Sequence, residues 1–500
     1  MKKSYLNLFL TLVLCLVIAA SFSACRGRQT TAVSNEITVI MASIGNNMDP
    51  QVANFTNTTI KMNHVYDTLL RLDDSLGLVP AVATSWRTPN NLTYEFVIGE
   101  GYRFHNGDPL TMDDIIFSFE RLSNIPQTAS LSNRIASVSG AGNVLTITLT
   151  APNSAFLRDV APIILVNRRH VLASGDAYAN NPIGTGPYVV EEYIPGDRMV
   201  LRAWEDHPFG RARLDKITFR GIAEEVARYI ALESGDANFA PIGARDFARA
   251  QDNNSLIAVE KQTTNTNFVS MNTGMPPFDN VNIRRAMAHA YDKESFARIN
   301  PGRVPIDSMF PTMFATYHSA SGTPQFSVDE ARRLLTAEGY SAANPLRFDV
   351  ITYGAGDPII EAYQAILRTV GVEMSIVNME FGVFLEQMMR GEYQMLSGGW
   401  NNTTGSELSA MASYWTGSFG QSNISFFVND RADELYDIVL RSTNQNEIIT
   451  STREVQEIAA QYMPIIPTFR NNVFYGMSRN LRGVEILTNA LYSFREAYVE

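Results

Sequence analysis

Cysteine is almost absent from this chain of 500 residues. Only Cys15 and Cys25 are present, and residues 26–500 contain none. Disulfide bonds therefore cannot stabilise the body of the protein, and no cysteine nucleophile is available beyond the N-terminal region. Stability has to come from an apolar core, and the apolar content of 45% with 18% charged residues is ordinary for a globular protein.

Histidine and the common catalytic motifs are also scarce. The six histidines are scattered, without a pair at i, i+4 and without HExxH, so a histidine metal site has little support. GxSxG is absent. Gly184-Thr185-Gly186 begins like a phosphate loop, but Pro187 follows, and neither GxxxxGK[ST] nor GxGxxG is completed. We expect no cofactor and no metal.

The acidic residues do not form an obvious catalytic pair. Asp113 and Asp114 are adjacent, as are Glu224 and Glu225, and adjacent side chains on a helix point in different directions. A general acid and its partner base must face one substrate. These pairs are therefore typical of solvated helix faces, and an exported hydrolase that uses other carboxylates stays an alternative.

Positive charge is in deficit, and the formal net charge is -11, which argues against a nucleic-acid partner. The apolar run at residues 8–20 is interrupted only by Thr11, and it is shorter than the roughly 20 residues of a membrane-spanning helix. Lys2 and Lys3 precede it and small residues follow. This pattern predicts a secretory signal over residues 1–24 and an exported protein, with a membrane-spanning helix as the alternative.

The remaining chain exceeds the size at which a single core keeps growing, so at least two domains are expected. Strand and helix patterns alternate in two separate regions, which favours two α/β lobes. The predicted elements of these regions are strands at 37–42, 217–220, 346–352 and 372–377, and helices at 58–71, 224–234, 283–291, 329–338 and 359–370.

Residues 80–121 carry the most detailed pattern. Val82 and Trp86 are four residues apart, which predicts one face of a short helix. Residues 92–98 alternate in apolar character, as in a strand with one buried face. Thr111 and Asp114 have the spacing of a helix cap with a carboxylate in the first turn.

These residues resemble the signature region of the family 5 extracellular solute-binding proteins, the peptide- and nickel-type receptors of ABC importers. Three further blocks follow in the order that the family has them, at residues 182–188, 277–292 and 331–340. The resemblance covers most of the chain beyond residue 36. It implies an α/β, two-lobed periplasmic-binding-protein-like fold (type II, cluster C-like) with an extra small α/β domain inserted in the first lobe.

The resemblance also implies how the chain is divided. The expected parts are a signal peptide (1–24), a lipid-anchored tether (25–36), the first part of lobe I (37–72), inserted domain II (73–183), the second part of lobe I (184–267), lobe II or domain III (268–466), and a return to lobe I (467–500).

Cys25 follows Phe22-Ser23-Ala24, which is similar to a lipobox, in which the cysteine receives lipid and becomes the first mature residue. Family lipoboxes usually carry leucine where this chain has Phe22. Cleavage after Ala24 without lipid attachment is the alternative. Either way, the polar residues 26–36 are typical of a tether ahead of the folded body.

The resemblance indicates ligand contacts in two segments. Asn54, Phe55 and Thr56 correspond roughly to backbone with which peptide-binding members pair their ligand, or they form a plain surface turn. The second segment is Trp400, Asn401, Asn402 and Thr403, where Thr403 stands in place of the aspartate that meets a peptide's free amine. Trp400 could equally pack in the core, and Tyr414 adds an aromatic side chain that faces either the cleft or the interior.

The sequence therefore predicts an extracytoplasmic substrate-binding lipoprotein of an ABC importer and no enzyme. It would act as a monomer that captures a peptide or a similar polar solute in an interlobe cleft and delivers it to permease subunits served by a cytoplasmic ATPase. A surface adhesin or structural lipoprotein is the other alternative.

Overall fold

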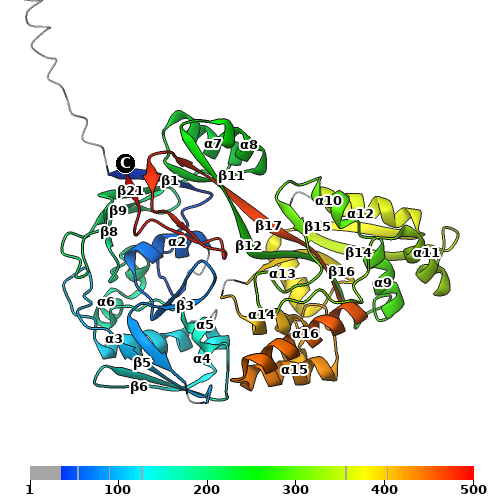
Figure 1. Cartoon of the computed structure of the whole chain (residues 1–500), viewed down its shortest axis with the longest axis horizontal. Coiled ribbons are helices and arrows are strands. Elements are labelled where there is room, and N and C mark those ends of the chain that lie inside the picture. Colours follow the sequence, from blue (N-terminus) through cyan, green and yellow to red (C-terminus); the bar gives the residue numbers. More distant parts are fainter. Residues whose placement is uncertain (1–34, 53–55, 89, 126–127, 355–356, 403) are drawn as a thin grey trace, which may run out of the picture.

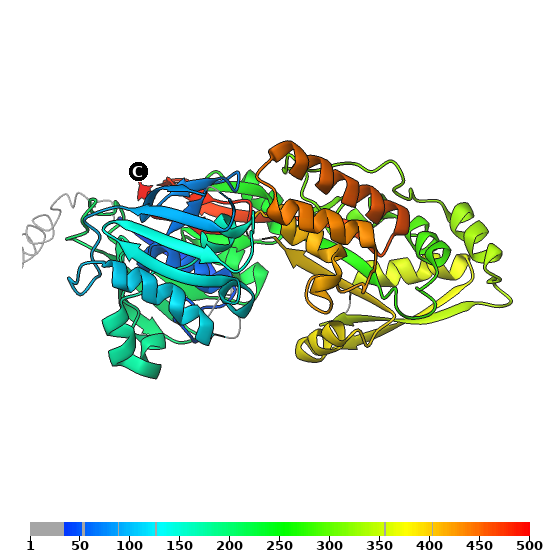
Figure 2. The ribbon, with the colours of Figure 1, turned by 90° about the horizontal axis from the view of Figure 1, so that it is seen from below.

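The computed structural model describes residues 35–52, 56–88, 90–125, 128–354, 357–402 and 404–500. Within these ranges the chain forms two lobes that lie side by side and are joined by two long strands (Figure 1). A view turned by 90° shows an elongated molecule with one lobe at each end (Figure 2). In this part of the chain, no helix has the length and apolar character to cross a membrane.

A single mixed sheet runs through both lobes. Its strand order is β15-β14-β16-β12-β17-β11-β1-β10-β9-β8, and β13 also pairs with β17. The strands β12 (Leu256–Met271) and β17 (Ile465–Ser478) belong to both lobes. They pair at residues 256–262 in one lobe and at 266–270 in the other, with a register shift between Gln262 and Thr266. We call this irregular point the crossing.

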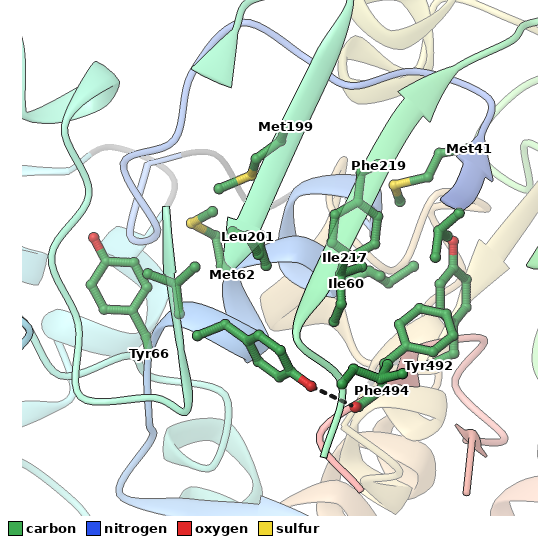
Figure 3. Packing of buried hydrophobic residues seen from close by; sticks show 14 of the residues in the cluster. Met41, Ile60, Met62, Tyr66, Met199, Leu201, Ile217, Phe219, Tyr492 and Phe494 are labelled. Atoms are coloured by element: carbon green, nitrogen blue, oxygen red, sulfur yellow. Dashed lines mark hydrogen bonds between the residues drawn. The ribbon is translucent and has the colours of Figure 1, made fainter. Parts of the chain in front are cut away.

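Lobe I is built on the short strands at one end of this sheet. In β1, the apolar residues Ile37, Val39 and Met41 alternate along the strand and are buried on one face. The helix α2 packs against this face through Ile60 and Met62 (Figure 3). The elements of lobe I are β1 (Glu36–Met41), α2 (Thr56–Val65), β8 (Tyr188–Ile194), β9 (Arg198–Ala203), β10 (Lys216–Gly221), α7 (Glu225–Ser234), β11 (Phe239–Ile242) and α8 (Ala244–Asp252).

A small subdomain emerges from lobe I after α2. Its four-stranded antiparallel sheet has the order β4-β5-β7-β6 and a core of its own that includes Tyr94, Phe96 and Ile147. We call it the β4–β7 subdomain. Its elements are β2 (Leu70–Leu72), β3 (Leu78–Pro80), β4 (Ala83–Arg87), β5 (Thr93–Ile98), α3 (Met112–Glu120), α4 (Ala129–Ser132), β6 (Ile135–Ala141), β7 (Val144–Leu149), α5 (Phe156–Val160) and α6 (Arg168–Ser174).

Lobe II covers both faces of the other end of the sheet with helices. One core includes Val350 and Leu367, and the other includes Leu396 and Leu435. The elements of lobe II are α9 (Val281–His289), α10 (Lys293–Ala297), β13 (Arg303–Pro305), α11 (Val328–Ala337), β14 (Leu346–Tyr353), α12 (Pro358–Thr369), β15 (Val372–Met379), α13 (Phe381–Arg390), β16 (Met395–Asn401), α14 (Glu407–Met411), α15 (Asp430–Arg441) and α16 (Gln445–Tyr462).

The C-terminal segment returns to lobe I, where the chain makes the short strands β18 (Leu481–Arg482), β19 (Glu485–Ile486), β20 (Tyr492–Ser493) and β21 (Tyr498–Val499). Tyr492 and Phe494 lie among the core residues of lobe I (Figure 3). The backbone N–H of Phe494 donates to Nε2 of the buried His64 at 2.8 Å. His64 Nδ1 lies 2.8 Å from the carbonyl oxygen of Ile60, so the neutral ring with its proton on Nδ1 satisfies both contacts.

Several local predictions are confirmed. Thr111 and Asp114 form a capping box at the start of α3, in which each side chain bonds the other residue's backbone N–H. The predicted strand at 92–98 is β5. Gly184 and Gly186 lie against the backbone of Val65 and His64, where a Cβ atom at either position would collide. Their role in this structure is therefore close packing of two backbones.

One predicted helix is wrong, and another is shorter than predicted. The segment with Val82 and Trp86 forms β4, because Ala83 pairs with Ile98 and Trp86 with Phe96 along β5. The helix predicted over 58–71 stops at Val65, and β2 starts at residue 70. After Val65 the backbone carbonyls bond other parts of the chain, since Asp67 accepts from the N–H of Leu165 at 3.1 Å. Tertiary pairing overrides the helical spacing in both places.

We predict that His64 makes folding sensitive to acid. Burial lowers the pKa of His64 to about 3, with a further contribution from Arg495. Below about pH 6.5 the His64 ring binds a proton in the unfolded chain but not in the folded protein. The free energy of unfolding should therefore fall by about 1.4 kcal/mol per pH unit because of His64. In His64→Gln the urea-derived stability should therefore fall less steeply between pH 6.5 and 4.5.

His207→Gln is the control, because the contacts of the His207 ring are local: it bonds the carbonyl of Gly210 and lies edge-on to Trp204 and Phe209. It should keep the wild-type slope. Parallel curves for wild type and His64→Gln would contradict the assignment.

Candidate functional site

The crossing places polar side chains between the lobes. Thr263 donates to the carbonyl oxygen of Asn471 at 2.6 Å, and the Asn471 amide donates to Asn265 Oδ1 at 2.7 Å. Thr264 donates from its hydroxyl to the carbonyl of Asn402 at 2.9 Å. Here side-chain bonds replace the regular ladder between β12 and β17, so the sheet holds together at the point where it changes lobe.

Trp400 belongs to a row of side chains that runs across three strands of lobe II. Thr266 of β12 pairs with Trp400 of β16 on one side and with Arg470 of β17 on the other. Directly paired residues of antiparallel strands point to the same face, with Cβ atoms about 5 Å apart. We call this set, Trp400, Thr266 and Arg470, the strand row. Sequence reasoning singled out Trp400 but not Arg470, because pairing along β17 has no signature in the sequence.

The predicted residues Trp400, Asn401 and Asn402 lie together at the end of β16. Trp400 is half-buried. Its side chain packs against the core of lobe II, and part of its surface stays exposed. Asn401 Oδ1 lies 3.1 Å from the Thr264 hydroxyl. Asn402 is 2% exposed, and its Oδ1 atom has no hydrogen-bond partner among the described residues. An unsatisfied buried acceptor of this kind is uncommon and marks a place where a donor could be added.

The segment that follows β16 touches the β4–β7 subdomain. Gly405 lies against Leu76, at the tip of the turn between β2 and β3, and Leu76 is 1% exposed although it has a positive φ of 59°. Arg158 of α5 donates to the carbonyl oxygens of Leu76 and Thr404. Arg158 therefore bridges the two lobes, and sequence reasoning identified neither Leu76 nor Arg158.

A second contact joins the lobes through α15. The Asn91 amide donates to the carbonyl of Ser442 at 2.8 Å. The Ser154 backbone N–H donates to the carbonyl of Leu440 at 2.8 Å, and its hydroxyl donates to that of Val439 at 2.7 Å. The lobes are therefore in contact at the crossing and also at the end of α15. Contact at separate places is expected when two lobes have closed on each other.

Tyr414 lies in the interior of lobe II. It is 2% exposed and belongs to the apolar core there, and burial raises the pKa of its phenol. Its neighbour Trp415 stacks on Tyr436 with ring centroids 4.2 Å apart. A solute in contact with Trp400 would therefore find the ring of Tyr414 covered in this arrangement.

The other predicted site residues are divided by the described ranges. Thr56 is exposed at the first position of α2 in lobe I, so a solute would have to bridge the lobes to touch both Thr56 and Trp400. Asn54, Phe55, Thr403 and Cys25 lie outside the described residues.

A hollow of about 370 Å³ lies elsewhere, on lobe I and the β4–β7 subdomain. It is lined by His105, Asn106, residues 180–183 and residues 189–193. Burial lowers the pKa of His105 to about 4. No wall of the hollow comes from lobe II, so closure of the lobes would not enclose a ligand there. The candidate site is therefore placed at the crossing and the strand row.

The chemistry of this site is that of recognition. Amide, hydroxyl and guanidinium groups supply donors and acceptors, and Trp400 supplies an apolar surface. Across the described part of the chain, no group of three or more His, Cys, Asp or Glu side chains is placed to hold a metal ion. The arrangement can bind a polar solute between two lobes without forming or breaking a covalent bond.

Comparisons with known proteins show the family and the fold of this chain. Residues 77–422 match the family described as "Bacterial extracellular solute-binding proteins, family 5 Middle". The glutathione-binding protein GsiB of Salmonella typhimurium is 24% identical over 482 residues, which is 92% of this chain and 94% of that protein.

Solved structures show the same fold. HbpA2 from Haemophilus parasuis has a TM-score of 0.83 at 21% identity, over 93% of this chain and all of that one. The periplasmic binding protein DppA from Helicobacter pylori in complex with the peptide STSA has a TM-score of 0.79 at 21% identity, over 93% and 98% of the two chains.

The fold therefore defines a two-lobed binding protein of the periplasmic cluster C type. The chain belongs to the bacterial extracellular solute-binding proteins of family 5, the family of peptide- and nickel-type receptors of ABC transporters, whose members bind solutes and are not catalysts.

We predict that the absence of a side chain at Gly405 allows the two lobes to lie close together. A Cβ at this position would lie 2.9 Å from Cβ and Cδ1 of Leu76, and the φ of Gly405 is +66°. Gly405→Ala should therefore cost about 1 kcal/mol of stability from the backbone and should also push the lobes apart. Small-angle scattering should report a larger radius of gyration for this variant.

Gly339→Ala is the matched control, since Gly339 has a φ of +86° and no described atom within 4 Å of its Cβ position. It should lose similar stability at an unchanged radius. If both variants keep the wild-type radius, Gly405 has no part in the approach of the lobes.

Proposed function

We propose that this protein is the extracytoplasmic receptor of an ABC importer that captures a peptide or a peptide-like polar solute between its lobes and delivers it to the membrane permease. The observation that carries the proposal is the position of residues 400–402 at the end of β16, beside the crossing strand β12. Gly405, a few residues further along the chain, lies against Leu76 of the opposite lobe. A solute there gains contacts from both lobes when they are closed.

The relatives support the class of solute. One is named for glutathione, a small peptide, and another was solved with a bound tetrapeptide. We extend the proposal to the ligand contacts Asn54, Phe55, Thr56, Trp400, Asn401, Asn402 and Thr403, with Tyr414 placed for contact only if lobe II rearranges. We also propose the division of the chain at residues 72/73, 183/184, 267/268 and 466/467.

The proposal includes a preference within the peptide class. Thr403 offers a neutral oxygen where peptide-binding members have an aspartate, so the ammonium of an ordinary peptide would be enclosed without its ionic partner. The carbonyls of Asn402 and Thr404, the residues on either side, are already engaged by Thr264 and Arg158. Blocked or internal peptide segments should therefore bind better than simple di- and tripeptides. Glu407, which begins α14, is the nearest acid along the chain that could replace the aspartate.

The test uses matched peptides that differ only at the N-terminus. We expect the acetylated form to bind wild-type protein at least as tightly as the free amine. Thr403→Asp should improve binding of the free amine by about tenfold to a hundredfold, because it restores a hydrogen bond to a charged group. Calorimetry measures both affinities, and Thr403→Asn is the neutral control. If wild type strongly prefers the free amine and Thr403→Asp does not change this, the proposed preference for blocked or internal peptide segments is wrong.

Lipid attachment at Cys25 is the last part of the proposal. If Cys25 carries acyl chains, Cys25→Ala should move the protein from the membrane fraction to the soluble fraction, because each buried methylene contributes about 0.8 kcal/mol to membrane binding. Fractionation and immunoblotting of cells give the measurement. Equal partitioning of wild type and variant would remove the lipoprotein claim and leave the solute-binding function untouched.

A further inference from the structure

Arg470 is a buried cation at the candidate site. It is 5% exposed and lies on β17 between Thr266 of β12 and Val304 of β13. Its Nη1 donates to the Thr312 hydroxyl. With the Gln262 amide turned so that its oxygen faces the guanidinium, that oxygen accepts from Nε at 3.3 Å and from Nη2. Both partners are neutral, and no Asp or Glu in the described ranges forms an ion pair with Arg470.

Two other buried arginines show how this protein usually accommodates such a charge. Arg284 is 4% exposed and donates to three backbone carbonyls, those of Tyr462, Phe278 and Asp279. Arg228 is 5% exposed and also donates to three carbonyls, with the Glu225 carboxylate 3.5 Å away. Arg470 has only two neutral side-chain oxygens for its five N–H donors.

An arginine in this position carries an energetic cost. A buried charge without an anion or a full set of acceptors is unfavourable. Burial accordingly lowers the pKa of Arg470, which Tyr317 partly offsets, although a guanidinium stays protonated at neutral pH. Charged groups that are perturbed by burial and lack a partner in the chain are frequent at functional sites, which makes Arg470 a candidate for binding an anion from outside the chain.

The location of Arg470 indicates which anion this is. Through Thr266 it lies in the strand row with Trp400, and through Gln262 it touches the crossing. A solute held against Trp400 could therefore present a charged end to Arg470 two strands away, at a spacing of roughly 10 Å for two steps across the sheet. This is about the length of a short peptide, at 3.3 to 3.6 Å per residue.

We propose that Arg470 receives a carboxylate of the transported solute, in a bidentate pair that forms when the lobes close. The proposal rests on the function stated above and makes it more specific: the solute is an acid whose anionic end lies at β17. A guanidinium and a carboxylate match in geometry, and their paired hydrogen bonds are stronger than those between neutral groups.

The experiment compares acetyl-tetra-alanine as its free acid with the same peptide as its C-terminal amide. By calorimetry, wild type should bind the acid about tenfold to a hundredfold more tightly. Arg470→Gln should bind acid and amide equally. Arg303→Gln is the control, since Arg303 lies on the adjacent strand and faces Asp357, and it should keep the preference for the acid.

Each outcome decides between the two proposals. If wild type binds acid and amide equally, the role of Arg470 is overturned and the peptide function stands. If neither peptide binds, the peptide function is overturned, and Arg470 is then judged by glutarate against glutaramide. A preference for glutarate that Arg470→Gln abolishes supports the carboxylate site. No such preference overturns it.

Thermal unfolding without ligand excludes a purely structural role. Removal of an unbalanced buried charge should leave Arg470→Gln melting at or above the wild-type temperature. Arg284→Gln should melt well below wild type, because it leaves three backbone carbonyls without their donor. If Arg470→Gln loses as much as Arg284→Gln, Arg470 is a structural group and the proposal fails.

Discussion

The architecture depends on the pairing of β12 with β17. Each strand is long enough to take part in both lobes, and together they give the molecule one continuous sheet instead of two. Between Gln262 and Thr266 the regular ladder is interrupted, and side-chain bonds from Thr263, Thr264 and Asn471 take its place. A sheet that is continuous but irregular at one point can hold the two lobes together and still allow them to rotate about that point.

Lobe I adds a second constraint, because its core is completed by residues from the end of the chain. Tyr492 and Phe494 pack beside α2 and β10 (Figure 3). Arg495 pairs with Asp67 at 2.7 Å, just after α2. The chain therefore has to pass through lobe II and come back before lobe I is complete. This return is the reason that two strands join the lobes.

Polar groups at the crossing serve both structure and recognition. Thr264 fixes Asn402 by a bond to its carbonyl, while Asn402 Oδ1 stays without a partner among the described residues. Thr266 joins Trp400 to Arg470 along one row of the sheet. The groups with unused hydrogen-bonding capacity thus lie on strands, or directly after one, that the fold already holds in place, which keeps the cost of ordering them low when a solute binds.

The local patterns of the sequence determined much of the fold. The capping box at Thr111 and the alternation that forms β5 follow from interactions within a few residues, so they could be predicted. The blocks shared with the family led to the expectation that Trp400 contacts the ligand. The segment at Val82 and the end of α2 could not be predicted, because pairing with β5 and bonds to distant backbone overrode helical spacing.

The tertiary structure alone brought together Trp400, Thr266 and Arg470, which are far apart in sequence and meet only through strand register. It alone brought Leu76 against Gly405. It also enclosed Tyr414 in the core, where the sequence had left the direction of the ring open. The physical reason is that composition and spacing fix what each segment can form, whereas burial and the partners of a charge depend on segments that arrive from elsewhere in the chain.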